Sequence, residues 1–151
     1  MKVSEAFPRP VGGQQLAVEV ARYLLASDGA VSVMATCSTG GCVRGPVDLK
    51  ASSDPMDQLA RLIQGPPRLR RCIYLVAEFS GSPLERVEVA VHRTWTMTRI
   101  IGDDRRVVEG ERHALLRELR ALRRSVELGR LVTVTVASAG GVVGIVEILR
   151  H

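Results

Sequence analysis

Two arginines flank an aromatic and a thioether side chain in the segment Arg93-Thr94-Trp95-Thr96-Met97-Thr98-Arg99. Arg93 and Arg99 can hold phosphate oxygens, because a guanidinium stays charged and presents several N–H donors in one plane. Trp95 can stack on a base, since every base has a π face. Met97 adds a polarizable apolar contact. The segment is typical of a strand that holds a nucleic acid by its phosphates and stacks one of its bases.

A second set of arginines recurs at helical spacing: Arg117, Arg120 and Arg124. The net charge of +5 and the pI of about 9.7 favour polyanionic partners. Two alternatives remain open. An arginine-bearing helix face is often only solvated, and a GC-rich genome or a hot habitat also produces a chain whose 21 basic residues include only two lysines, Lys2 and Lys50.

Trp95 has an alternative place in the protein core. The two-residue period of a strand from about Glu85 to Ile101 would put it on the same face as Val87, Val89 and Val91. Aromatic residues make up only 3% of the chain, which argues against repeated base stacking. We therefore expect any nucleic-acid binding to depend on phosphate contacts and to weaken with salt.

Cys37 and Cys42 flank the four-residue turn Ser38-Thr39-Gly40-Gly41. Two thiols across so short a turn are candidates for a disulfide. The further hypothesis of a small thiol-dependent enzyme would use one of them as its nucleophile. Three cysteines and three scattered histidines show no metal-ligand spacing, and no catalytic signature is intact. We expect no enzyme activity, no catalytic residues, no metal and no cofactor.

The chain carries no run of about 18 apolar residues and no signal-peptide pattern, so we expect a cytoplasmic protein without a membrane partner. The valine-rich segment from Leu131 to Leu149 carries few charges and would form a final hairpin. Its edges could pair with a second copy. An assembly subunit that self-associates into a homo-oligomer is therefore the second functional hypothesis.

Helical and strand periodicities alternate along the chain. Residues 1–12 contain Pro8 and Pro10 and are expected to form an extended N-terminal arm, and residues 13–151 a single domain. The segments expected to be helical are 13–27, 53–64 and 111–128, and the expected strands are 31–37, 42–49, 72–77, 85–101, 131–137 and 142–149. This order, roughly αββ-αββ-αββ, predicts an α+β fold in which helices pack on one face of a mostly antiparallel sheet.

The 93–99 segment and the arginine-rich helix after it give the chain a weak resemblance to the ThermoDBP-type single-stranded DNA-binding proteins of hyperthermophilic archaea and their relatives. The resemblance covers most of the chain and rests on its size, basic balance, thermophile-like composition and layout of helices and sheet. It implies non-enzymatic binding of single-stranded DNA or RNA with low sequence specificity. The long C-terminal leucine zipper of the family's type member has no counterpart in this sequence.

Overall fold

A computed structural model describes residues 2–8, 13–64, 71–92 and 95–121. Within them the chain forms six strands and three helices. In chain order the elements are β1 (Lys2–Pro8), α1 (Gly13–Ala26), β2 (Ala30–Thr39), β3 (Cys42–Asp48), α2 (Pro55–Ile63), β4 (Arg71–Phe79), β5 (Leu84–Val91), β6 (Trp95–Gly102) and a helix over residues 105–121.

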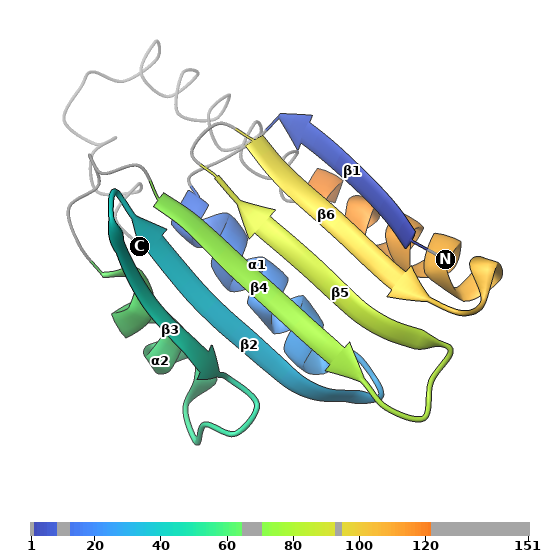
Figure 1. Cartoon of the computed structure of the whole chain (residues 1–151), viewed down its shortest axis with the longest axis horizontal. Coiled ribbons are helices and arrows are strands. Elements are labelled where there is room, and N and C mark those ends of the chain that lie inside the picture. The colour runs from blue at the N-terminus through green and yellow to red at the C-terminus, as the bar shows by residue number, and fades with distance from the viewer. Residues whose placement is uncertain (1, 9–12, 65–70, 93–94, 122–151) are drawn as a thin grey trace, which may run out of the picture.

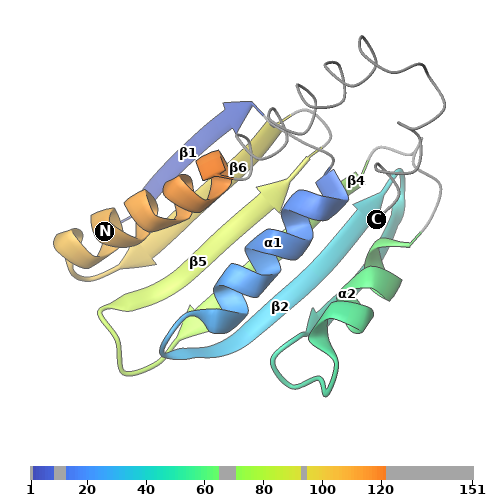
Figure 2. The same cartoon turned by 180° about the vertical axis from the view of Figure 1, so that it is seen from behind.

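The six strands form one sheet in the order β1-β6-β5-β4-β2-β3, and every neighbouring pair is antiparallel. Figure 1 views the sheet from the side that carries no described helix, and Figure 2 shows α1, α2 and helix 105–121 together on the other side. We call the sheet side under these helices the inner face and the opposite side the outer face. The predicted α+β fold, with helices on one face of an antiparallel sheet, is confirmed.

The core forms where apolar helix stripes meet alternate strand residues. Leu16, Val20 and Leu24 recur at helical spacing on α1 and are almost completely buried. Helix α2 lies within the predicted segment 53–64. Its N-cap is Asp54, whose carboxylate accepts a hydrogen bond from the Asp57 amide at 3.0 Å, and Pro55 stands in the first turn. The central strand β4 contributes Ile73, Leu75 and Ala77 to this core.

The prediction of one long strand from about Glu85 to Ile101 is wrong. The chain reverses after Val91, and β5 pairs with β6 so that Val91 faces Thr96 and Val89 faces Thr98. This pairing joins odd positions of β5 to even positions of β6. The valines therefore share the buried inner face with Thr96 and Thr98, and Trp95 and Met97 belong to the outer face.

The expected N-terminal arm is instead a strand of the sheet. Residues 2–8 form β1, an edge strand that pairs antiparallel with β6 from Lys2 opposite Ile101 to Pro8 opposite Trp95. Pro8 ends this strand, a place that tolerates a residue without an amide donor. The last described helix also begins earlier than predicted, at residue 105, where the Asp104 carboxylate accepts from the Arg106 amide at 2.7 Å. The predicted hairpin 131–149 lies outside the described residues.

Candidate functional site

The outer face carries the chemically distinctive side chains of three neighbouring central strands. Across β4, β5 and β6 the strand register aligns them in rows. From the β5–β6 turn toward the other end of the sheet, the rows are Cys72, His92 and Trp95, then Tyr74, Ala90 and Met97, then Val76, Glu88 and Arg99. An aromatic end, an apolar middle and an ionic end therefore follow one another along the strands.

Trp95 is the exposed aromatic side chain of this surface, with 38% of its surface accessible. Its ring is stacked on the His92 imidazole, with centroids 3.6 Å apart and planes inclined by 21°. The His92 amide donates to the Trp95 carbonyl at 2.9 Å, which fixes the two residues opposite each other where β5 turns into β6. Because neither ring is in the core, the core alternative for Trp95 does not hold.

Cys72 lies beside His92, with its Sγ 3.4 Å from His92 Nε2. Burial, with a smaller contribution from Cys37, raises the pKa of the Cys72 thiol, and burial lowers the pKa of His92. Both shifts favour the neutral forms near neutral pH. A thiol nucleophile needs the opposite arrangement, a thiolate stabilised by an imidazolium or another cation, so this pair is not activated for attack.

Glu88 lies at the ionic end of the outer face and is only 5% exposed. Arg99 Nη1 donates to its Oε2 at 3.1 Å, and Arg86 Nε lies 3.0 Å from its Oε1. Tyr74 also hydrogen-bonds this carboxylate, and its hydroxyl pKa is raised by burial first and by Glu88 second. Glu88 is therefore shared by three side chains from all three central strands.

The structure divides the predicted site into two parts. Trp95, Met97 and Arg99 come together on the outer face. Arg117 and Arg120 are exposed on helix 105–121, which covers the inner face, so they lie on the opposite side of the sheet (Figure 2). Arg93 and Arg124, the two other predicted members, lie outside the described residues.

Cys37 and Cys42 are not joined by a disulfide. In the β2–β3 register Cys42 lies opposite Thr39, and Cys37 lies opposite Arg44, so the two cysteines are not cross-strand partners. Cys37 is buried in the core at 1% exposure, whereas Cys42 is exposed. A core thiol packed against Ile73 has no access to a substrate, which weighs against Cys37 as a nucleophile.

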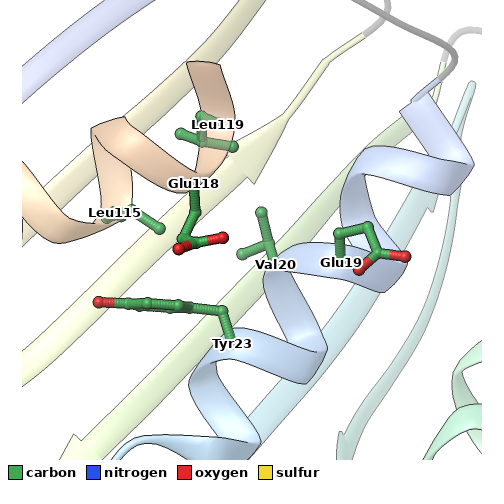
Figure 3. A pocket seen from close by; sticks show the side chains of 6 residues that line it. All are labelled: Glu19, Val20, Tyr23, Leu115, Glu118 and Leu119. Carbon is green, nitrogen blue, oxygen red and sulfur yellow. The ribbon is translucent and has the colours of Figure 1, made fainter. Parts of the chain in front are cut away.

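Among the described residues, a hollow lies on the helix side between α1 and helix 105–121 (Figure 3). Its volume is about 50 Å³, which is too small for an organic ligand. The lining residues are Glu19, Val20, Tyr23, Leu115, Glu118 and Leu119. Tyr23 donates a hydrogen bond to Glu111 Oε1 at 2.8 Å, so this contact joins the two helices. We regard the hollow as a packing feature of the helix layer.

The assembly hypothesis rests on the hairpin 131–149, which lies outside the described residues. The described part of the sheet has two edge strands, β1 and β3, and side chains are described along β3. Val43 is 67% exposed there, so the strand is accessible to another chain. Pro46 removes one amide donor from the same strand, and the Arg44 side chain donates to the Gln64 carbonyl at 2.9 Å. Proline and charge on an edge strand oppose pairing between sheets.

Within the described residues, no helix is long and apolar enough to cross a membrane. The same part of the chain holds no cluster of three or more histidine, cysteine or acidic side chains that could bind a metal ion.

Arg86, Glu88 and Tyr74 are site residues that sequence reasoning missed. Arg86 and Glu88 are two positions apart on one strand, which is a signal that their side chains share a face. Their coupling to Arg99 and Tyr74 depends on the strand register. No protein-family model matches the chain, and no curated protein or solved structure shows significant similarity to it.

Proposed function

We propose that this protein binds single-stranded nucleic acid on the outer face of its sheet, without enzymatic activity and with little base-sequence preference. In this proposal Trp95 stacks on a base, Met97 supports the same nucleotide by apolar contact, and Arg99 holds a phosphate. The observation that carries the proposal is the exposure of Trp95 on the face that bears no described helix. The resemblance to ThermoDBP-type proteins agrees with it.

The preference for single strands follows from the stacking contact. A base inside a duplex is already stacked on its neighbours and paired, so its π face is not accessible to an indole. A single strand offers that face with every nucleotide, whatever the base. We therefore expect binding with little base-sequence preference. Discrimination between DNA and RNA would depend on other contacts.

Arg117 and Arg120 take a different role in the proposal from the one that their spacing suggested, and Arg124 lies outside the described residues. Arg117 and Arg120 lie on the helix side, so one strand of nucleic acid cannot contact them and Trp95 through the sheet. They supply net positive charge that attracts polyanions at long range.

The test is fluorescence anisotropy with labelled single-stranded DNA, single-stranded RNA and duplex DNA over a salt series. Trp95 is the only tryptophan in the chain, so its intrinsic emission reports on the proposed contact in the same samples. We expect single strands to bind more tightly than the duplex, with a linear fall of log K against log salt and quenching of Trp95.

Two outcomes would contradict the proposal in different ways. Binding without any change in Trp95 emission would move the contact surface away from the outer face. A complete lack of binding at low salt would remove the proposal and leave the assembly hypothesis, which sizing by light scattering would then examine.

A further inference from the structure

A buried carboxylate between two arginines on the outer face needs an explanation of its own. Burying a carboxylate is unfavourable unless charges and hydrogen bonds compensate it. Glu88 is compensated by Arg86, Arg99 and Tyr74, as described above. A charge that served only solubility would gain nothing from such enclosure, since exposed charges are hydrated at no cost.

The two arginines are held by Glu88 but not enclosed by it. Their side chains keep 41% and 34% of their surface accessible for Arg86 and Arg99 respectively, against 6% for Glu88. A guanidinium has five N–H donors, and within the described residues a single hydrogen bond from Arg99 to Glu88 is formed. Arg86 Nε is near Glu88 Oε1 yet makes no aligned hydrogen bond. The Nε atoms of both arginines are buried, so the donors left for another acceptor are on the terminal Nη atoms.

Holding an arginine in place before a ligand arrives favours binding. A mobile arginine loses rotamer entropy when it is immobilised. An arginine already fixed by a carboxylate has lost much of that freedom on folding, so ligand binding costs less side-chain entropy. Glu88 neutralises one of the two guanidiniums, and the exposed Glu78 lies opposite Arg86, so the attraction for a phosphodiester comes from the guanidinium donors and not from a local excess of positive charge.

We infer that Arg86 and Arg99, held in position by Glu88, form a subsite for one phosphodiester of the bound strand. This inference rests on the proposed function and extends it with two residues. Arg99 lies four positions from Trp95 along β6, which corresponds to roughly 13 Å of strand. The subsite therefore takes the phosphate of a neighbouring nucleotide, and the nucleic acid runs along β5 and β6. In this arrangement Glu88 is a positioning residue that touches no ligand.

A pair of matched glutamate variants separates positioning from simple charge. Glu88→Gln and Glu78→Gln each remove one negative charge, and Glu78 is exposed and lies opposite Arg86 in the strand register. A purely electrostatic surface would bind polyanions more tightly after either change. Positioning predicts opposite signs: Glu88→Gln binds about tenfold more weakly because the arginines are released, while Glu78→Gln binds as tightly as wild type or more tightly.

The salt dependence of Arg86→Gln provides a readout that a structural role would not change. Loss of one phosphate contact lowers the slope of log K against log salt by about one unit. An oligonucleotide with abasic sites keeps its phosphates and loses its bases. We expect Arg86→Gln to reduce the slope for this ligand as well, even though the abasic strand no longer quenches Trp95.

The controls keep the two proposals distinguishable. Circular dichroism and thermal unfolding check that each variant folds, and if Glu88→Gln does not fold, the slope of Arg86→Gln decides. Equal affinity of Glu88→Gln and Glu78→Gln, or an unchanged slope for Arg86→Gln, overturns the subsite while Trp95 quenching by wild-type protein still supports the proposed function. Failure of the wild-type protein to bind single strands overturns both.

Discussion

The indole of Trp95 and the imidazole of His92 lie one against the other, 3.6 Å apart between ring centroids and inclined by only 21°. One face of the indole is therefore occupied by a neighbour from the preceding strand. The imidazole beneath restrains the indole in that orientation. In the proposed function a base would stack on the indole face that remains, and the pair would act as a preformed platform.

Replacing Trp95 by alanine should weaken single-strand binding and leave the fold nearly unchanged. Stacking of one base on an aromatic side chain contributes about 1–3 kcal/mol, which corresponds to a loss of about 5- to 150-fold in affinity. The salt slope should stay the same, because no phosphate contact is removed. Anisotropy measures the affinity, and Trp95→Phe serves as the conservative variant that should recover part of it. Equal affinity for wild type and Trp95→Ala would contradict the stacking role.

His92 should titrate below the ordinary histidine pKa of 6.5, because burial lowers its pKa. Between pH 6.5 and that lower pKa the unfolded chain binds more protons at this residue than the folded protein. Its contribution to the free energy of unfolding therefore falls as the pH drops through this window. NMR titration of the imidazole, with His92→Gln to assign the resonance, measures the pKa directly. A pKa at or above 6.5 would be inconsistent with burial at the outer face.

Two arginine variants with the same charge change should differ in their effect on binding. Arg99→Ala removes a proposed phosphate contact and should lower the salt slope by about one unit. Arg117→Ala removes an exposed charge on the helix side of the sheet. Salt screens such a charge at the outer face, since the Debye length is about 10 Å at 0.1 M salt. At that salt we expect the affinity of Arg117→Ala to stay within about twofold of wild type. A larger loss from Arg117→Ala than from Arg99→Ala would place the interface on the helix side.

Thr96→Val should stabilise the protein. The Thr96 side chain is completely buried, and within the described residues its hydroxyl has no hydrogen-bond partner. Removing an unsatisfied hydroxyl while keeping the shape recovers its desolvation penalty, so the free energy of unfolding should rise by about 1 kcal/mol. Denaturant unfolding measures the change. Thr39→Val is the comparison, because the Thr39 hydroxyl bonds the Cys42 carbonyl at 3.4 Å and its loss brings no such gain.

Tyr23→Phe should destabilise the helix layer and change its response to alkaline pH. The variant loses the hydrogen bond to Glu111 that joins α1 to helix 105–121, which costs about 0.5–1.5 kcal/mol. Burial, and then Glu111, raise the pKa of Tyr23 above the ordinary 10.0. The folded protein therefore holds this proton more tightly than the unfolded chain, and stability declines as the pH rises above 10.0. Between about pH 9 and 11 the midpoint temperature of thermal unfolding should fall more steeply for wild type than for Tyr23→Phe.

The sequence predicted the fold class and most elements because their signals are local. Apolar spacing over residues 13–27 and the cap at Asp54 with Pro55 are local signals, and the corresponding helices are present. The β5–β6 turn was missed because Val91 to Trp95 contains no glycine, proline, asparagine or aspartate, so the two-residue period continued across it. That error assigned Trp95 to the valine face. The Glu88 contacts were beyond reach for a different reason, since they depend on which residues of three strands lie opposite one another.

The pairing of β1 with β6 also determines the order in which the molecule can be completed. Lys2 is synthesised before its partner Ile101, and strands β2, β3, β4 and β5 are all made between them. Until then β1 has no neighbour in the sheet, and its backbone donors and acceptors remain unpaired. Contacts between residues so far apart in sequence also slow folding. The nascent chain therefore passes through a stage in which the six elements from α1 to β5 can assemble while β1 still lacks its partner strand.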